Sequence, residues 1–303
     1  MFTGLTIQAF KNKFTTNEAC MQYLIEQKWG NGYKCYKCGH NEYVKGRQWF
    51  YKRCKSCCYD ESATANTVFH GAKLNLLRVF ELAYRIVLRK KGMSSCELAK
   101  ELGCQQKTAW EWKAKFQFAM KSSEQYDLQG TVEVDEFMVG GFEPEAPGRT
   151  KGNKSLVVLS VEKVRDKKGK ENIGRAYART IDNASAESLR IIFEKHISKE
   201  TIVKTDTWRG YLPLVKDWKI SQVLSDKGEG MKMLHIHIMN LKGWLRGIHH
   251  KCSKERLQYY LDEYHFRFNR RNSIAKIFDR LMGRAIQTWP HPYASIKVCE
   301  ACT

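Results

Sequence analysis

The stretch Thr131–Gly141 (TVEVDEFMVGG) constrains the fold more than any other part of this chain. Successive residues of a β-strand point to opposite faces, so Val132 and Val134 lie on the face opposite to Asp135. Both faces also carry apolar residues, which indicates a central strand rather than an edge strand. A carboxylate within such a strand is costly to bury unless it is paired or bound to a cation, so Asp135 is a candidate metal ligand.

A second aspartate ends another β-prone run, in Thr201–Tyr211 (TIVKTDTWRGY). Asp206 stands directly before turn-like residues, where the tip of a strand presents a side chain to a cleft. Two aspartates at two strand ends suggest one shared metal site. Either residue alone would also fit a strand-end cap or half of an ion pair.

Charge narrows the choice of partner. The 303 residues include 52 Lys and Arg against 32 Asp and Glu, a net charge of +20 spread along the whole chain. Such a surplus favours a polyanion, most simply nucleic acid, and exceeds what a solvated surface needs for solubility. The length allows two or three domains with their own cores.

No run of 18 apolar residues exists, so we expect no membrane partner. The first residues (MFTGLTIQAFKNKF) lack the basic start and apolar core of a signal peptide, which predicts a protein that stays inside the cell. In that reducing environment the 11 cysteines should be metal ligands or core thiols rather than disulfides.

Four cysteines have the spacing of a structural zinc site, CxxC, fifteen residues, CxxC. They are Cys35, Cys38, Cys54 and Cys57. We predict a zinc ribbon over residues 31–62, with the aromatic and basic segment Glu42–Tyr51 as its hairpin. Cys58 could replace its neighbour as a ligand, but Cys57 completes the CxxC. So small a unit has little core, so zinc would stabilise the fold rather than do chemistry.

Helical sequence patterns precede and follow the predicted ribbon. Residues 1–30 read as a helical lead-in, and residues 70–122 as a helical domain with a helix-turn-helix over Ser94–Phe116, turning at Gly103. Four of its polar residues are expected to face outward and contact DNA: Gln105, Gln106, Lys107 and Lys113. An ordinary three-helix bundle fits the same pattern, and the basic charge favours the DNA-binding interpretation.

The element order over residues 128–290 predicts an α/β domain with an RNase H-like mixed sheet. After Thr131–Gly141 and a Gly- and Pro-rich loop, Phe142–Lys154, come two strands, one helix, and the strand that bears Asp206. This topology places the first and fourth strands side by side, so that Asp135 and Asp206 can share a metal ion. A later helix, Met231–Ile248, aligns four residues along one side: His237, Asn240, Leu241 and Trp244.

Together these segments resemble the DDE transposases of bacterial insertion sequences, within them the insertion-sequence 1595 family. The residues that carry the resemblance are the zinc ribbon, VEVDEFMVGG, the Asp206 strand, HIMNLKGWLRGIHH (His237–His250) and LQYYLDEYHFRFNRR (Leu257–Arg271). The resemblance implies a metal-dependent polynucleotidyl transferase on an RNase H-like fold. The metal ligands of such transposases are usually Asp, Asp and Glu, and they correspond here to Asp135, Asp206 and Asn240. Glu263 is the alternative third ligand.

Phosphodiester cleavage is helped by two Mg²⁺ or Mn²⁺ ions about 4 Å apart, held by hard oxygen ligands. Asp135 would bridge them, Asp206 would bind one, and Asn240 would offer an oxygen or a water to the other. The resemblance implies that water frees a 3′-hydroxyl at the element's end and that this hydroxyl then attacks target DNA. The expected partners are terminal inverted repeats, target DNA and at least a second copy, in the bacterial cytoplasm with the nucleoid.

Basic residues near the end of the chain are candidate phosphate contacts, although an amphipathic helix with a basic face explains them equally well. They are Arg246, Arg267, Arg270 and Arg271. His249, His250 and Cys252 are interpreted as structural rather than as a second metal site. The C-terminal tail, 291–303, holds a further CxxC, Cys299 and Cys302, without a partner pair.

Two other functions are compatible with this sequence. One is a DNA-binding regulator without catalysis, which the neutral Asn240 favours and the presence of both Asp135 and Asp206 disfavours. The other is an RNase H-like nuclease that cleaves DNA without strand transfer.

Overall fold

The computed structural model describes residues 1–141, 152, 154–224, 226–249 and 252–290. The chain divides into two compact units, Met1–Met120 with Asn272–Thr303, and Lys121–Arg271. Nearly all of the expected loop Phe142–Lys154 lies outside the described residues, as do Cys299 and Cys302.

The second unit is built on a five-stranded mixed sheet in the order β6-β5-β4-β7-β8. Its strands are β4 (Thr131–Val139), β5 (Ser155–Arg165), β6 (Glu171–Ile181), β7 (Ile202–Thr205) and β8 (Lys219–Gln222). β4, β5 and β6 pair antiparallel, whereas β7 lies parallel to both β4 and β8. Three antiparallel strands followed by a helical crossover to a parallel strand confirm the predicted RNase H-like fold class.

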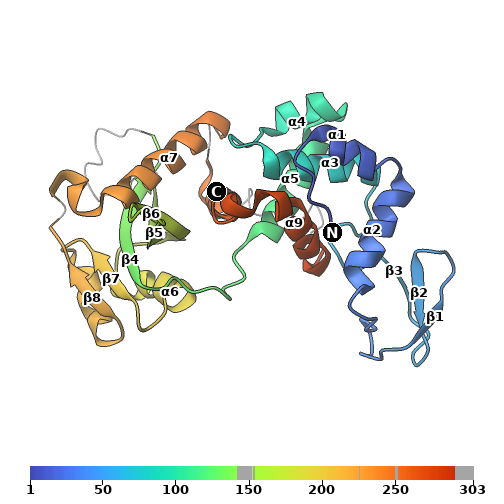
Figure 1. The fold of residues 1–303 in the computed structure, drawn as a ribbon, viewed down its shortest axis with the longest axis horizontal. Coiled ribbons are helices and arrows are strands. Elements are labelled where there is room, and N and C mark those ends of the chain that lie inside the picture. Colours follow the sequence, from blue (N-terminus) through green and yellow to red (C-terminus); the bar gives the residue numbers. More distant parts are fainter. Residues whose placement is uncertain (142–151, 153, 225, 250–251, 291–303) are drawn as a thin grey trace. The chain divides into compact units, whose positions relative to one another are not determined.

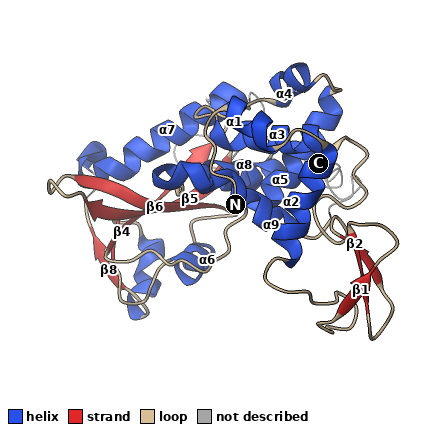
Figure 2. Ribbon diagram, turned by 45° about the vertical axis from the view of Figure 1, so that its right-hand side comes forward, coloured by secondary structure: helices blue, strands red, loops and turns tan. Residues whose placement is uncertain are grey.

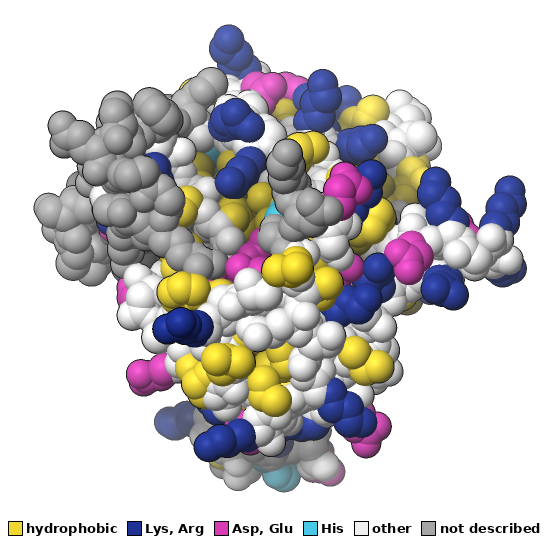
Figure 3. Space-filling model, turned by 90° about the vertical axis from the view of Figure 1, so that its left-hand side faces the viewer, with side chains coloured by type: hydrophobic (Ala, Val, Ile, Leu, Met, Phe, Trp, Pro, Cys, Tyr) yellow, Lys and Arg dark blue, Asp and Glu magenta, His cyan; other side chains and the backbone are white. Residues whose placement is uncertain are grey.

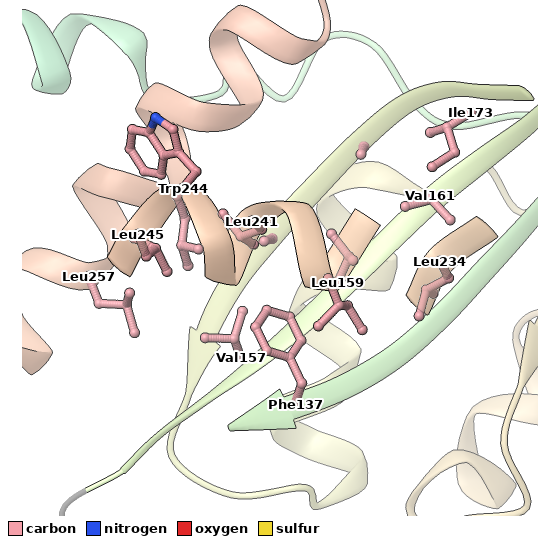
Figure 4. Packing of buried hydrophobic residues seen from close by; sticks show 14 of the residues in the cluster. Phe137, Val157, Leu159, Val161, Ile173, Leu234, Leu241, Trp244, Leu245 and Leu257 are labelled. Carbon is pink, nitrogen blue, oxygen red and sulfur yellow. The ribbon is translucent and has the colours of Figure 1, made fainter. Parts of the chain in front are cut away.

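Helices cover both faces of this sheet, as the alternation along β4 predicts. The helical segments are α6 (Ala186–His196), η1 (Arg209–Lys216), η2 (Asp226–Met231), α7 (Lys232–Ile248) and α8 (Lys254–Phe268). Val132 and Val134 pack with residues of α6 and η1. Phe137 packs on the other face, with Leu241 of α7 and Leu257 of α8 (Figure 4). Burial of these apolar side chains on both faces stabilises β4 in its place in the sheet, and the strand in turn positions Asp135.

The first unit combines helices with a small three-stranded sheet (Figure 2). Its helices are α1 (Ile7–Lys13), α2 (Asn17–Trp29), α3 (Leu76–Leu88), α4 (Ser95–Leu102), α5 (Gln106–Met120) and α9 (Ile277–Gln287), the last preceded by η3 (Arg271–Lys276). The sheet is β1 (Tyr43–Lys45), β2 (Tyr51–Cys54) and β3 (Asp60–Ser62), all antiparallel. The hairpin expected between the two cysteine pairs is therefore formed by β1 and β2.

The last helix, α9, differs from expectation in its packing. Its sequence position suggested the catalytic segment 128–290, yet its Phe278 lies among the aromatic rings of Phe10, Phe14 and Phe80. The Tyr23 hydroxyl also donates to Asp279 at 2.7 Å. The chain thus returns to the first unit after α8. The sequence did not indicate this return, because the amphipathic pattern of α9 shows that the helix has a buried face but not which core that face joins.

Three buried histidines make the second unit sensitive to acid. Burial lowers the pKa of His196 and of His265 from 6.5 to about 4, and it also depresses the pKa of His237, whose Nε2 lies 3.2 Å from that of His265. Folded molecules keep these rings neutral, whereas unfolded chains protonate them below about pH 6.5. We therefore expect the free energy of unfolding to fall below pH 6.5, by at most about 2 kcal/mol per histidine at about pH 5.

Urea unfolding at a series of pH values measures this effect. In His196→Phe the ring stacked on Tyr177 is retained and the titration is lost, so stability should depend less steeply on pH than in the wild type. Equal slopes for the two proteins would contradict the assignment.

Among the described residues, no helix is long and apolar enough to span a bilayer.

Candidate active site and zinc centre

The parallel pairing of β4 with β7 brings the two aspartates together. The last register pair is Glu133 with Lys204, and Asp135 and Asp206 each follow two residues later on strands that run in the same direction. One ligand oxygen from Asp135, one from Asp206 and one from Glu136 all lie within 4.8 Å of one another. Two distant segments thus form one acidic group, the arrangement expected from the sheet topology.

Local hydrogen bonds orient each of these carboxylates. Asp135 Oδ1 accepts from the backbone N–H of Glu136 at 2.8 Å, and Asp206 Oδ1 accepts from the backbone N–H of Trp208 at 3.0 Å. The Tyr211 hydroxyl donates to Glu136 Oε2 at 2.6 Å. Burial and the nearby carboxylates hold the pKa of Tyr211 well above its ordinary value, so the phenol stays protonated and acts as the donor.

Hard carboxylate oxygens on half-buried side chains are the ligands that Mg²⁺ and Mn²⁺ prefer, so this donor set fits such ions. Figure 3 views the side of the second unit at which β7 and β8 lie, and Asp and Glu side chains are scattered there among Lys and Arg side chains. The three grouped carboxylates suit a site that binds cations, and the basic surplus of the chain suits a polyanion partner.

Glu136 was not predicted as a site residue, because a period of two places it on the face opposite to Asp135. A signal was nevertheless present, since Glu136 adjoins Asp135 directly. Glu133 shares the Asp135 face but is buried against the Lys163 amine, 3.2 Å away, and does not belong to the acidic group.

α7 places one further polar group beside the acids. His235 Nε2 lies 4.0 Å from Asp135 Oδ2. Asn240 follows five residues later on the same helix, a rotation of about 140°, and its side chain is exposed. His237, Leu241 and Trp244 are instead buried, so Asn240 lies at the solvent-exposed edge of the side of α7 that these residues share.

Glu263, the alternative third ligand, is fully buried in α8. Its charge acts on the Arg267 guanidinium, whose pKa is lowered by burial and raised again by this carboxylate. Among the described residues, the acidic group around Asp135 does not include Glu263.

The four cysteines of the first unit come together as the spacing predicts. Cys35 Sγ lies 3.6 Å from Cys57 Sγ, and Cys38 Sγ lies 3.5 Å from Cys54 Sγ. All four sulfur atoms lie within 4.8 Å of one another, which fits a tetrahedral zinc ion. Cys58 lies outside this group and is exposed, at a positive φ of 57°.

The helical pair over Ser94–Phe116 forms as expected. Ser94 caps α4 in a capping box with Glu97, Gly103 ends it in a left-handed conformation, and α5 follows. Gln105, Gln106 and Lys107 are exposed at the start of α5. Lys113 is not: its side chain is buried and its amine donates to the Met93 carbonyl at 2.8 Å. The outward orientation predicted for Lys113 is therefore wrong, because a long aliphatic stem lets a lysine on the inner face reach a backbone carbonyl.

The four arginines predicted to contact phosphates also differ in their surroundings. Arg246 is exposed, whereas Arg267 lies over the Trp244 ring and Arg270 over the Phe266 ring. Arg271 donates to the carbonyls of Ile173, Gly174 and Phe268, which ties α8 to β6. Arg246 and Arg271 thus have exposed side chains, as expected for phosphate contacts, whereas Arg267 and Arg270 are partly buried against aromatic rings.

An RNase H-like sheet with carboxylates from two adjacent parallel strands offers a place where divalent ions could be held for phosphoryl transfer. Residues 127–269 match the family model described as the ISXO2-like transposase domain. This segment is therefore similar to the transposase domains that the model describes, which supports the resemblance to insertion-sequence 1595 transposases. No curated protein matches the chain.

Proposed function

We propose that this protein is the DNA transposase of an insertion sequence, which binds the terminal inverted repeats of its element and catalyses strand cleavage and strand transfer. The observation that supports this most is the convergence of Asp135 and Asp206 within the transposase domain. A bound pair of Mg²⁺ or Mn²⁺ ions would supply Lewis-acid stabilisation of the attacking and leaving oxygens.

The residues themselves have simpler tasks. Asp135 and Asp206 would hold the cations, and hydrogen bonds from Glu136 N–H and Trp208 N–H keep their carboxylates in place. His235, beside Asp135, can donate to a phosphate oxygen that enters the site. Asn240 as the third metal ligand stays a prediction from the sequence.

The first unit is proposed to recognise DNA. Its zinc ribbon carries exposed basic side chains such as Arg47, Arg53 and Lys55, and the start of α5 presents Gln105 and Gln106. Glutamine can pair with adenine in the major groove, and the cations can contact phosphates. This assigns recognition and catalysis to separate domains, with the helix-turn-helix interpretation still a prediction.

Because an insertion sequence has two ends, we propose that at least two copies act together on DNA, in the bacterial cytoplasm beside the nucleoid. Strand transfer distinguishes this function from that of a nuclease. A labelled, precleaved end with a free 3′-hydroxyl is incubated with plasmid target and Mn²⁺, and we expect the label to be joined to the plasmid. Cleavage of uncut ends without joined product would favour the nuclease.

A further inference from the structure

Asp135, Asp206 and Asn240 leave the metal site short of negative charge. Two divalent ions carry four positive charges, and a carboxamide contributes an oxygen but no charge. Asn240 is also exposed on α7, about 140° around the helix from His235, the residue of that helix that lies beside Asp135. A third carboxylate close to Asp135 and Asp206 would supply the missing charge.

Glu136 is that carboxylate. One of its oxygens lies within 4.8 Å of ligand oxygens of both Asp135 and Asp206. We propose that Glu136 is the third carboxylate of the catalytic metal site and that Tyr211 is the positioning residue that holds it there. This inference rests on the proposed function, because it concerns ions that the same site would bind.

The strand geometry shows why a positioning residue is needed. Glu136 begins on the sheet face opposite to Asp135, the face that α6 and η1 cover. β7 ends at Thr205, so β4 has no partner in β7 at the level of Glu136. A side chain at this level can therefore reach round the end of β7 toward Asp206. A flexible glutamate side chain can adopt several rotamers, and only some of them point toward Asp206. A specific contact is therefore needed to favour such a rotamer.

Tyr211 provides that contact. Its side chain is fully buried in the core between the sheet, α6 and η1, so the phenol has little freedom to move. Its hydroxyl donates to Glu136 Oε2 at 2.6 Å, a short bond to a charged acceptor. A carboxylate has two oxygens, so one can accept this bond while the other binds an ion. Groups that orient a ligand in this way typically change metal affinity about 10- to 100-fold.

Mn²⁺ binding to the full chain, followed by electron paramagnetic resonance, tests the proposal without depending on cleavage. Tyr211→Phe removes only the hydroxyl and should weaken Mn²⁺ binding about 10-fold. Glu136→Gln removes the charge and should weaken it more, about 100-fold. Cleavage by Tyr211→Phe should recover when Mn²⁺ is raised by the same factor, which a merely structural defect would not allow.

One variant serves as a matched control. Tyr177→Phe also removes a tyrosine hydroxyl from this unit, one that donates to the Tyr126 carbonyl at 3.2 Å, and should leave Mn²⁺ affinity unchanged. Asn240→Ala, measured beside Glu136→Gln, compares the two candidates for the third ligand. Thermal melting establishes that each variant is folded, and if Tyr211→Phe is not, Glu136→Gln alone decides.

The outcomes separate this inference from the function on which it rests. Wild-type affinity in Glu136→Gln, together with lost binding in Asp135→Asn, would overturn the role of Glu136 and leave the transposase site standing. Weaker binding in Asn240→Ala, with Glu136→Gln unaffected, would give the third position to Asn240. A wild-type protein without any Asp135-dependent Mn²⁺ binding would refute the proposed function itself.

Discussion

Asp135→Asn is expected to abolish DNA cleavage, with a fall in rate on the order of a thousandfold or more, while binding of the element's end is retained. The carboxylate lies next to Asp206 and Glu136, and its loss removes a negatively charged ligand at the centre of the site. Metal stabilisation of the transition state amounts to several kcal/mol, and each 1.36 kcal/mol is a factor of ten in rate. Asp206→Asn should behave alike. Gel cleavage and mobility-shift assays on one labelled duplex measure both properties.

Asp166→Asn is a matched control for these two variants. Asp166 lies in the turn between β5 and β6, where its carboxylate accepts from the backbone N–H groups of Lys168 and Lys170, a role that asparagine can also fill. It should cleave as the wild type does. Retained cleavage in Asp135→Asn or in Asp206→Asn would remove that residue from the active site.

Cys35→Ser is expected to release zinc from the ribbon and to weaken binding to the element's ends strongly. Cys35 is buried among the other three thiols, and the small β1-β2-β3 sheet has little apolar core of its own. Structural zinc in such units is worth about 10 kcal/mol or more, so its loss should unfold the ribbon. Elemental analysis and binding to specific and random duplexes measure the two effects.

Cys58→Ser is the control for this change, since Cys58 is exposed directly beside Cys57 but outside the sulfur cluster. It should keep its zinc and its DNA affinity. Should Cys35→Ser retain zinc in full, the four-cysteine centre would be wrong. Should Cys58→Ser lose it, Cys58 would replace Cys57 as a ligand.

Much of the fold could be predicted because its signals are local. Alternation along β4 indicated a strand buried on both faces, and the paired CxxC spacing indicated the zinc ribbon before any contact was known. The membership of α9 could not be predicted. Phe278 faces a core built from residues near the opposite end of the chain, and an amphipathic pattern does not identify its partner.

The candidate site was predictable to the extent that strand order places side chains. Asp135 and Asp206 followed from a parallel pairing of the first and fourth strands. Glu136 did not, because its position depends on the end of β7 and on a hydroxyl from a residue 75 positions away, Tyr211. Lys113 and Arg271 show the same limit, since each basic side chain is bound to backbone carbonyls of its own fold.

The most direct test of the transposase assignment is cleavage of a labelled duplex that carries the element's own end, by the wild-type protein, in Mg²⁺ or Mn²⁺ and in EDTA. We predict a nick at the element's 3′ end that requires the divalent ion and disappears with EDTA. Tight binding of the same duplex without cleavage in either metal would contradict the account and favour a DNA-binding regulator.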